Sequence, residues 1–487
     1  MAKRVAVIDI GSNSVRMVIY EKTSRFAFHL LYETKTKVRL SQDIYQNNGY
    51  LQDKPMKRAY EALKDFSAII QSFKVRKTLC VATSALRDAP NRKDFINRIK
   101  RDLKLNIKII DGEKEAYFGA IACANLLVQQ QKALTIDIGG GSTEFSIIND
   151  KNISNNISLH LGTVRLKELF FDNNKIDEAI QYIDNKLEVL NNFNINSIVG
   201  IGGTFRAIAI SIMKAQDYPL KKIHGFEFDA KVLNKLLTDI LEADENKLKE
   251  LNIKKNRYDI IKPGTLILSR IMKKFKIQNI TASGVGVREG VYLNDLLRNS
   301  KDKMPVNYNT SMRYILDIHV EDLSFSNQLS KLTKELFDLT YKKLNLDKKY
   351  RTDLAIAAKL YTSGSNIHFY TQYRHSYHLV SDALEYGFSH KQITLIATLV
   401  KYAGRKSATS SHLDKFSDLL PKRDTLDILN YILSLSIALL SHRPRNIDFE
   451  LSLKGSTINI DSKTSLYLVK DALNKLEPIK EISVKVS

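Results

Sequence analysis

Apolar segments of two kinds alternate along residues 1–300 of the chain. Short apolar runs predict strands, and longer stretches with helical spacing of their apolar positions predict helices. We expect strands at 4–10, 15–20, 27–33, 78–82 and 107–110, and helices at 53–73 and 93–103. A similar order returns with a hairpin at 133–149, a helix at 176–191, and strands at 197–201 and 277–282. Alternating elements of this kind predict an α/β sheet in each half.

The pattern changes after about residue 303, where strand signals nearly disappear. Helical spacing dominates at 310–345, 351–362, 391–402 and 424–441, and only the tail at 451–460 and 482–487 resembles strands again. A polar, proline-containing stretch at 299–305 is typical of a linker. The sequence therefore predicts three parts: α/β domains at 1–127 and 128–302, and a mainly helical region with a possible small β tail at 303–487.

One phrase occurs twice. Residues 5–19 read VAVIDIGSNSVRMVI, and residues 133–147 read ALTIDIGGGSTEFSI. Each copy is an apolar run, a tight Asp-x-Gly-x-x-Ser turn and a second apolar run, which predicts a strand–turn–strand unit. Two such turns on duplicated domains are expected to face each other across a cleft and to hold a phosphate chain.

The first turn carries Ser12, Asn13 and Ser14 behind Asp9. Successive backbone N–H groups in a glycine-containing turn can cradle a phosphate, and the polar side chains add donors. Asp9 would repel a phosphate unless a cation lies between them, so this carboxylate implies Mg²⁺. The simpler alternative is a hairpin whose polar residues only satisfy the turn.

The second turn strengthens the phosphate interpretation. The turn contains three consecutive glycines, Gly139, Gly140 and Gly141, followed by Ser142. Glycines at these positions are a poor choice for the stability of the fold but allow the backbone to approach a ligand closely. Glu144 stands where the first copy has Arg16, and with Asp137 it makes a hard-cation site plausible. An exposed strand position for Glu144 remains equally open.

Two further turns point to phosphate. Gly202, Gly203 and Thr204 lie between an apolar strand and an apolar helix, where a helix N-terminus can bind an anion. Arg87 follows the strand TLCVA and suits phosphate binding, although a surface ion pair with Asp88 is the alternative.

Composition adds two constraints. The chain has 487 residues and a net charge of +22, which fits either a polyanion-binding surface or a generally lysine-rich composition. The two cysteines lie in apolar contexts, which favours a reducing cytoplasm. Asp9 interrupts the apolar core that a signal peptide would need. No apolar run approaches the ~18–20 residues of a membrane span.

Several ordered motifs carry a resemblance to a known family. IDIGSNSVR, ATSALRDAPN, DGEKEA, IDIGGGSTE, GIGGT and REG closely resemble the exopolyphosphatase / guanosine pentaphosphate phosphohydrolase (Ppx/GppA) family. That family belongs to the superfamily of actin, sugar kinases and heat-shock ATPases. The resemblance covers about residues 1–300 and implies two ribonuclease-H-like (actin-like ATPase) domains with the active site in the cleft between them.

The resemblance also implies roles for residues. Glu115, in Gly112–Ala116, matches the family's catalytic carboxylate and is expected to act as general base. Mg²⁺ is expected at Asp9, Asp137 and Glu144. Phosphate contacts are expected from Ser12, Asn13, Ser14, Arg87, Gly139, Gly140, Gly141, Ser142, Gly202, Gly203 and Thr204.

The C-terminal region resembles the HD-related domain of longer family members. A working HD site would read L-H-D-I-G, whereas residues 360–364 read LYTSG and lack the metal-binding pair. His368, His375 and His378 lie nearby, but without an aspartate partner we expect packing and polyanion-facing roles. No second active site is predicted.

The functional expectation is a cytoplasmic, Mg²⁺-dependent phosphohydrolase. It would release terminal orthophosphate from inorganic polyphosphate, convert guanosine pentaphosphate to the tetraphosphate, or both; ATP is a further candidate substrate. The segment Ser283–Val287 departs from the family's S-D-G-A-L and leaves that preference open. We expect a homodimer and no membrane or nucleic-acid partner. The alternatives are a small-molecule kinase of the same fold and a non-catalytic guanosine-polyphosphate sensor.

Overall fold

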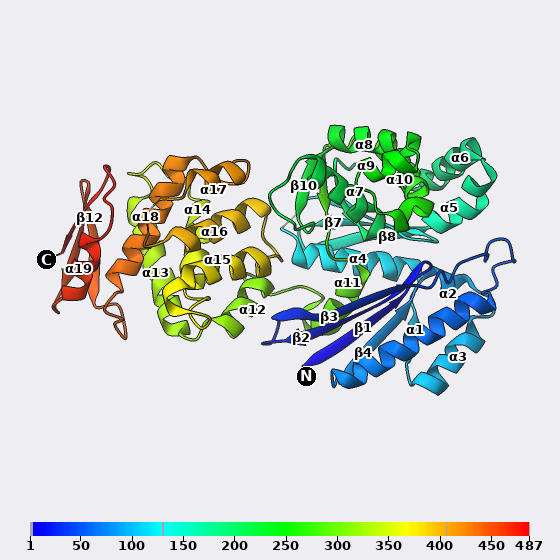
Figure 1. The fold of residues 1–487 in the computed structure, drawn as a ribbon, viewed down its shortest axis with the longest axis horizontal. Coiled ribbons are helices and arrows are strands. Elements are labelled where there is room, and N and C mark those ends of the chain that lie inside the picture. The colour runs from blue at the N-terminus through cyan, green and yellow to red at the C-terminus, as the bar shows by residue number, and fades with distance from the viewer. Residues whose placement is uncertain (1–2, 129–130, 406, 487) are drawn as a thin grey trace. The chain divides into compact units, whose positions relative to one another are not determined.

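A computed structural model describes residues 3–128, 131–405 and 407–486. It divides into two compact units, an N-terminal unit at 1–308 and a C-terminal unit at 309–487 (Figure 1). The boundary expected between 127 and 128 falls inside the N-terminal unit, just after a helix that ends at Leu126. The three-part division remains a prediction.

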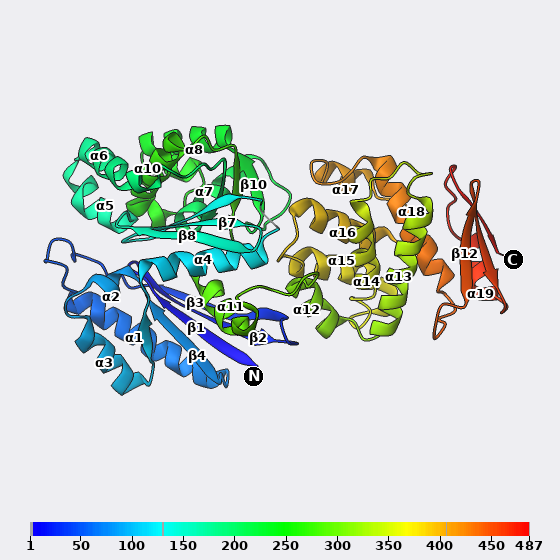
Figure 2. The same cartoon turned by 180° about the vertical axis from the view of Figure 1, so that it is seen from behind.

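The first sheet of the N-terminal unit has the strand order β3-β2-β1-β4-β5. Its first three strands are antiparallel, and β4 and β5 join in parallel. Helices α1 and α3 lie along it on the side away from the second sheet (Figures 1 and 2). The elements are β1 (Arg4–Ile10), β2 (Ser14–Lys22), β3 (Phe28–Lys37), α1 (Asp53–Ser72), β4 (Lys77–Ala82), α2 (Ser84–Asp88), α3 (Arg92–Leu103) and β5 (Ile107–Ile109).

The second sheet has the order β10-β11-β9-β6-β7-β8, and its core is formed with α6, α7, α8 and α10. The hairpin β6–β7 occupies the place that β1–β2 has in the first sheet. The elements are β6 (Ala133–Ile138), β7 (Thr143–Asn149), β8 (Asn152–Leu159), α5 (Thr163–Leu169), α6 (Ile176–Leu187), β9 (Ser197–Ile201), α7 (Gly202–Ala215), β10 (Phe226–Asp229), α8 (Ala230–Glu242), α9 (Glu245–Glu250), α10 (Tyr258–Lys274) and β11 (Asn279–Ala282).

Two helices, α4 (Gly112–Leu126) and α11 (Val287–Leu296), lie between the sheets (Figures 1 and 2). Helix α4 packs on β6, β7 and β8, and α11 packs on β1 and on α4. A Cβ atom at Gly290 would lie 1.9 Å from the carbonyl oxygen of Phe118, so glycine is needed for the two helices to approach this closely. This packing joins the two α/β halves and fixes the space between their turns.

The C-terminal unit is mainly helical and has one hydrophobic core. The apolar residues from 432 to 439 lie in α18, and most of them are buried. Among the described residues, no helix is both long and apolar enough to cross a membrane. The elements are α12 (Thr310–His319), α13 (Leu323–Thr340), α14 (Tyr350–Leu360), α15 (Gln372–Ala383), α16 (His390–Tyr402), α17 (Ser410–Lys415), α18 (Arg423–Leu439), β12 (Phe449–Lys454), β13 (Thr457–Ser462), α19 (Tyr467–Asn474) and β14 (Ser483–Val486).

Some elements differ from the sequence predictions. The expected helix at 310–345 is two helices, because the Asp322 side chain caps the start of α13 by accepting from the amide of Phe325 at 2.8 Å. Strand β8 was missed because NISNNISL has few strongly apolar residues and lies at a sheet edge. Helix α15 was missed because its segment, QYRHSYHLVSDA, has few strongly apolar residues.

Candidate active site

The two copies of the repeated phrase form turns of the same construction. In the first turn, the amide of Gly11 donates to the carbonyl of Ser14 at 3.2 Å. In the second, the amide of Gly139 donates to the carbonyl of Ser142 at 2.9 Å. Both turns therefore close with the same hydrogen bond at the carboxyl end of the first strand of each hairpin.

Helix α5 fixes the direction of the amides in the second turn. The carbonyls of Gly139 and Gly140 accept from the amides of Thr163 at 2.9 Å and Val164 at 2.8 Å. The carbonyl of Gly141 accepts from Arg165 Nε at 3.0 Å. In a trans peptide the N–H points opposite to the carbonyl. Three successive N–H groups, of Gly140, Gly141 and Ser142, therefore point away from α5, as in an anion-binding nest.

The first turn is held in the same way by the segment at 39–41. The carbonyl of Ser12 accepts from the amide of Ser41 at 3.0 Å, and the carbonyl of Asn13 accepts from the amide of Arg39 at 3.0 Å. The N–H groups of Asn13 and Ser14 consequently point away from this segment. Each turn presents a short row of oriented backbone donors.

The two turns lie against each other, as the repeat predicts. A Cβ atom at Gly140 would lie 2.8 Å from Ser12 Cβ, and one at Gly141 would lie 2.4 Å from Ser84 Oγ. The hydroxyls of Ser12 and Ser84 are themselves 2.9 Å apart. The consecutive glycines thus allow the turn of one domain to approach the turn of the other.

A cleft of about 160 Å³ runs between the turns. Most of the residues predicted from the sequence line it, whereas Arg87 and Gly141 lie beside it. The predicted residues that line the cleft are Asp9, Ser12, Asn13, Ser14, Glu115, Asp137, Gly139, Gly140, Ser142, Glu144, Gly202, Gly203 and Thr204.

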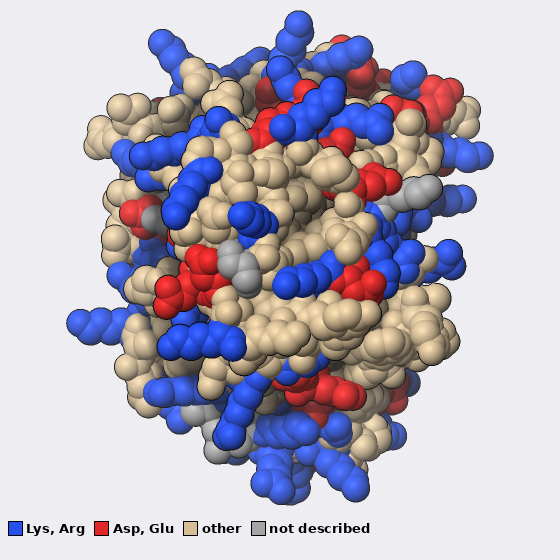
Figure 3. Space-filling view, turned by 90° about the vertical axis from the view of Figure 1, so that its left-hand side faces the viewer, with Lys and Arg blue, Asp and Glu red and all other residues tan. Residues whose placement is uncertain are grey.

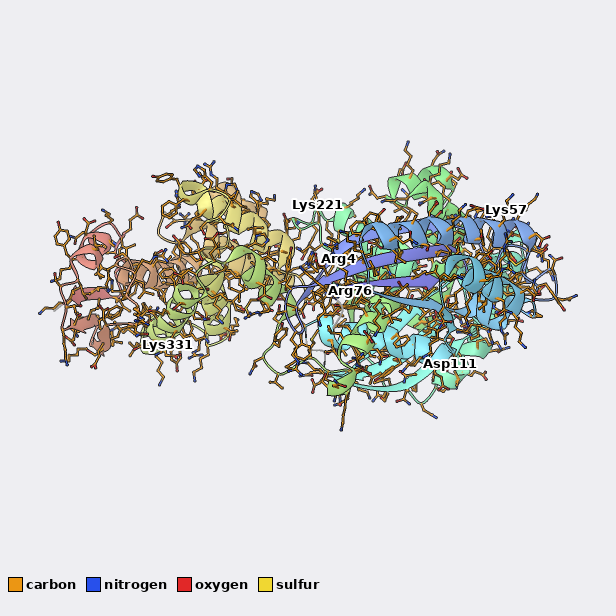
Figure 4. The ribbon with its side chains drawn as sticks, turned by 90° about the horizontal axis from the view of Figure 1, so that it is seen from below. Arg4, Lys57, Arg76, Asp111, Lys221 and Lys331 are labelled. Atoms are coloured by element: carbon orange, nitrogen blue, oxygen red, sulfur yellow. The ribbon has the colours of Figure 1, made fainter. Side chains whose placement is uncertain are left out.

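Glu115 lies in the first turn of α4. Asp111, labelled in Figure 4, caps this helix by accepting from the amide of Lys114 at 2.7 Å. Glu115 is 9% exposed and turns toward the cleft, whereas Glu113, two residues earlier, is exposed. Burial, and then the nearby carboxylate of Glu144, raise the pKa of Glu115 well above its ordinary value.

Arg87 contacts a carboxylate in the structure. Its Nη1 atom lies 3.1 Å from Glu115 Oε2 and also donates to the carbonyl of Ile110 at 3.3 Å. A looser ion pair with Asp88, at 3.5 Å, is the contact that the sequence offered as the alternative. The structure thus gives Arg87 a direct role in orienting Glu115, while its contact with phosphate stays a prediction.

Strand register places the charged residues in two rows. Asp9, Arg16 and Lys35 are direct cross-strand neighbours on β1, β2 and β3. At the equivalent positions of the second sheet, Asp137, Glu144 and Ser158 are neighbours on β6, β7 and β8. We call these the basic row and the acidic row.

Glu144 of the acidic row is buried and Asp137 is partly buried, and both carboxyl groups bind protons more readily than usual. Burial raises the pKa of Asp137 to about 6, and burial together with Asp137 raises the pKa of Glu144 to about 7. Burial also raises the pKa of Asp9. A hydrogen bond from Ser158 Oγ to Glu144 Oε1, at 2.8 Å, orients that carboxylate.

A bound cation would favour the charged forms of these carboxylates, and Mg²⁺ needs only one or two of them besides water and phosphate oxygens. The described side chains do not form a preorganised metal site with several ligands. Within the described ranges, no three His, Cys, Asp or Glu side chains group closely enough to hold a metal ion. The donor chemistry of Asp9, Asp137 and Glu144 therefore fits a magnesium ion shared with a phosphate, and their assignment as ligands remains a prediction.

Five cationic side chains that the sequence reasoning did not assign also line the cleft. They converge from β2, β3, α7, α11 and the segment before α10: Arg16, Lys35, Arg206, Arg288 and Arg257. Burial and then Arg16 lower the pKa of Lys35 to about 7. The motifs contained a signal for Arg16, Arg206 and Arg288, which lie within or beside quoted phrases, but none for Lys35 or Arg257.

The start of α7 depends on glycine at two positions. Gly202 has φ +82°, and a Cβ there would lie 2.2 Å from Asp137 Oδ1. A Cβ at Gly203 would lie 2.8 Å from the guanidinium of Arg257. The helix N-terminus therefore approaches both an acidic and a basic group of the cleft.

The sequence and structure match one family. The profile of the Ppx/GppA phosphatase family matches residues 18–299, and the profile of Ppx/GppA phosphatase, domain III, matches residues 309–481. The chain is 32% identical over 289 residues to a bifunctional 3-dehydroquinate synthase/phosphatase of Fusobacterium nucleatum, covering 55% of this chain and 43% of that protein. It is 31% identical over 301 residues to a putative exopolyphosphatase of Haemophilus influenzae, covering 59% and 90%.

A solved structure supports the fold. The Ppx/GppA family member of Aquifex aeolicus superposes with a TM-score of 0.54 at 27% identity, covering 63% of this chain and all of that chain. The fold class expected from the sequence is confirmed: α/β domains of the actin-like ATPase type, followed by a helical region. The chain spans less than half the length of the Fusobacterium relative.

Proposed function

Because the chain belongs to the Ppx/GppA phosphatase family, we propose that it is a Mg²⁺-dependent hydrolase that removes terminal orthophosphate from a polyphosphate chain. The candidate substrates are inorganic polyphosphate and guanosine pentaphosphate, with ATP as a third. The family supports phosphohydrolase activity, and the choice among these substrates is the proposal.

The observation that carries the proposal is the division of charge within one cleft. Glu115 and the two carboxylates of the acidic row, Asp137 and Glu144, line the same cleft. The cleft also holds the five cations described above. A substrate with several linked phosphates can place one phosphorus near Glu115 and the remaining negative charge among the cations.

In this proposal, phosphoryl transfer depends on positioning and on charge neutralisation. The oriented amides of both turns and the start of α7 bind phosphate oxygens. Glu115, fixed by Arg87, holds a water in line with the terminal phosphorus and accepts its proton. Mg²⁺ held by Asp9, Asp137 and Glu144 would neutralise charge on the departing phosphate.

The charges on one face of the molecule are mixed. On the face shown in Figure 3, lysine and arginine side chains are interspersed with acidic ones and do not form a single patch. Residues 309–487 contain 25 lysines and arginines against 19 acidic residues, so most of the excess of +22 belongs to residues 1–308. This distribution favours the N-terminal unit, which contains the cleft, over the helical region as the main polyanion-binding element.

The test is orthophosphate release by the purified protein. Inorganic polyphosphate, guanosine pentaphosphate and ATP are supplied separately, with Mg²⁺ and without, and with no phosphate acceptor present. Release that requires Mg²⁺ supports the proposal and excludes an obligatory kinase. Binding without release from any of the three would instead support a non-catalytic sensor.

Two further properties belong to the proposal. Cys80 and Cys123 are both buried free thiols, which is consistent with a reducing cytoplasm. A homodimer is proposed on the family resemblance alone, and sedimentation equilibrium of the purified chain tests it.

A further inference from the structure

Large apolar side chains are exposed where α15 begins in the C-terminal unit. Ile367, Phe369 and Tyr370 are 54%, 67% and 81% exposed, and they lie close together in the sequence. A short 3₁₀ turn, Phe369–Thr371, carries the two aromatic rings and leads directly into α15 (Figure 1). Single exposed apolar residues are common on proteins, whereas several adjoining ones mark a surface that another molecule covers.

Two arginines border the aromatic rings. The guanidinium carbon of Arg405, in the segment after α16, lies 3.4 Å from the centroid of the Tyr373 ring. The Nε atom of Arg374 donates to the Tyr373 hydroxyl at 3.0 Å. Residues four apart along a helical segment lie on the same side, so Tyr373 follows Phe369 and Arg374 follows Tyr370 along this surface. We call these five residues the aromatic patch: Phe369, Tyr370, Tyr373, Arg374 and Arg405.

Further cationic groups lie along α15 and on the helix beside it. Lys401, on α16, lies 4.7 Å from the ring centroid of Tyr377, and α15 packs on α16. His368 and His378 are exposed, and His375 is partly buried. The polyanion-facing role expected for these histidines from the sequence stays a prediction, and their place in the same segment as the aromatic patch is compatible with it.

The segments that form the aromatic patch contain cations and no carboxylates. Residues 354–381 and 386–413 include no aspartate and no glutamate. The first acidic residue along α15 is Asp382, which lies at the opposite end of the helix from the patch. Because no carboxylate of these segments offsets the positive charge, the surface attracts polyanions.

The exposed rings decide which kind of polyanion fits. A polyphosphate chain has no planar group, so Phe369 and Tyr370 would contribute little to its binding. Nucleobases have flat apolar faces that stack on aromatic side chains, while their phosphates bind neighbouring cations. In a duplex these faces are already stacked on one another, so only a single strand offers them to the protein. Exposed rings beside arginines are therefore typical of a surface that binds single-stranded nucleic acid.

We propose that the aromatic patch binds single-stranded nucleic acid. Bases stack on Phe369 and Tyr370, and the phosphates that join them contact Arg374 and Arg405. The expectation drawn from the sequence included no nucleic-acid partner, and it changes because only the structure shows that these rings are exposed. The inference goes beyond the proposed function and does not depend on it.

Two other occupants fit the aromatic patch less well. A second copy of the chain, docked through this patch about a two-fold axis, would bring the same cations together with no carboxylate from these segments between them. A segment that binds a membrane surface presents a continuous apolar helix face, whereas Asn366, Thr371 and Gln372 interrupt the apolar positions here. Charge and shape therefore favour the nucleic acid.

The experiment measures fluorescence anisotropy of a labelled oligouridylate of about 12 nucleotides with the full-length protein. Wild type should bind this single strand at least about tenfold more tightly than a uridine–adenosine duplex of the same length. Phe369→Ala and Tyr370→Ala should each weaken single-strand binding by about tenfold, because each removes a stacking surface. Arg374→Gln should weaken it by about threefold and lower the slope of log affinity against log salt by about 0.7.

Two exposed residues of the same unit serve as matched controls. Tyr467, on α19, is 77% exposed but lies four residues from the carboxylate of Asp471, so Tyr467→Ala controls for the loss of an exposed ring. Lys331, on α13 and labelled in Figure 4, is exposed and lies outside the segments of the patch, so Lys331→Gln controls for the loss of one charge. Each should change single-strand affinity by less than about twofold. Circular dichroism checks that every variant is folded.

Single-strand affinity that is unchanged in both Phe369→Ala and Tyr370→Ala would overturn the inference, because binding by general surface charge does not need these rings. Vesicles of phosphatidylcholine and phosphatidylglycerol test the membrane surface: binding that requires Phe369, without binding of the oligonucleotide, would also overturn it. Self-association in sedimentation equilibrium that Phe369→Ala abolishes, again without oligonucleotide binding, would assign the patch to a second copy of the chain.

Orthophosphate release keeps this test apart from the proposed function. The proposed reaction uses no residue of the aromatic patch, so Phe369→Ala and Tyr370→Ala should retain the kcat and KM of wild type for tripolyphosphate. Oligonucleotide binding by a protein that releases no orthophosphate would support the inference and count against the proposed function alone. Orthophosphate release without oligonucleotide binding would overturn the inference alone.

Discussion

The basic row and the acidic row occupy equivalent positions in two copies of one structural unit, and they differ in charge. Both begin with an aspartate at the end of the first strand, Asp9 and Asp137. The next strand then contributes Arg16 in one copy and Glu144 in the other. A duplicated hairpin thus provides the same backbone turn twice, while one cross-strand position gives each copy a side chain of different charge.

Under the proposed function, the comparison explains how one cleft would bind a polyanion and also act on its end. A symmetric basic pair would bind phosphate tightly without a place for a cation, and a symmetric acidic pair would repel it. With one row of each kind, the charge along the cleft is uneven. Glu115 shares the acidic environment, since Glu144 has the largest charge effect on its pKa.

The largest expected effect is at Glu115, which the proposal places as base beside the acidic row. Glu115→Gln should lower kcat by about 1000-fold while leaving polyphosphate affinity within about threefold. Orthophosphate release and calorimetry measure the two quantities. Glu113→Gln, two residues away and exposed, is the control and should retain activity. Survival of turnover in Glu115→Gln would remove this residue from the role of base.

A matched pair of changes tests whether the two rows differ in function. Glu144→Gln should lower kcat by about 100-fold and raise the Mg²⁺ concentration needed for half-maximal rate, because it removes charge beside Asp137. Arg16→Gln, at the equivalent position, should instead raise KM by about tenfold with a small effect on kcat. Similar kinetic effects of both changes would contradict the division between a basic and an acidic row.

The two turns should also differ in their tolerance of a side chain. A Cβ at Gly140 would lie 2.8 Å from Ser12 Cβ, whereas one at Gly11 would lie 3.4 Å from the nearest atom, the carbonyl oxygen of Ser14. Gly140→Ala should push the turns apart and lower kcat/KM by about 30-fold, while Gly11→Ala should lower it by less than about threefold. Equal sensitivity would show that the close approach of the turns is unimportant for activity.

The smallest expected effect concerns the basic row and pH. Burial and the neighbouring arginines lower the pKa of Lys35 from 10.5 to about 7, so its positive charge disappears as pH rises through 7. Tripolyphosphate affinity of Glu115→Gln protein should therefore fall by about fivefold between about pH 6 and pH 8, the effect of about 1 kcal/mol for one charge. Lys35→Met should flatten this part of the profile, and a profile unchanged by the substitution would show that Lys35 does not titrate there.

Lys35 should affect stability in the opposite direction. The unfolded chain binds a proton at Lys35 up to about pH 10, while the folded protein has lost it above pH 7. The Lys35 contribution to the free energy of unfolding therefore rises with pH between these values. Chemical denaturation of wild type and Lys35→Met at several pH values tests this sign.

The sequence by itself determined the features that depend on local hydrogen bonding and on the order of elements. The repeated Asp-x-Gly-x-x-Ser phrase specifies its own closing hydrogen bond, as the Gly11–Ser14 and Gly139–Ser142 contacts show. Asp111 is a helix cap by local geometry, and this places Glu115 in the first turn of α4. Residues near in sequence set these features, so the motifs predicted most of the cleft lining.

Only the tertiary structure decided which distant side chains meet and which charges are buried. Arg87, on α2, contacts Glu115, on α4, and no local signal in the sequence links them. Lys35 and Arg257 reach the cleft from opposite halves of the N-terminal unit. The raised pKa values of Asp137 and Glu144 come from burial, which arises when two sheets and two helices close around the same space. Local patterns in a single sequence do not reveal such long-range packing, because many side chains of the same type remain at the surface.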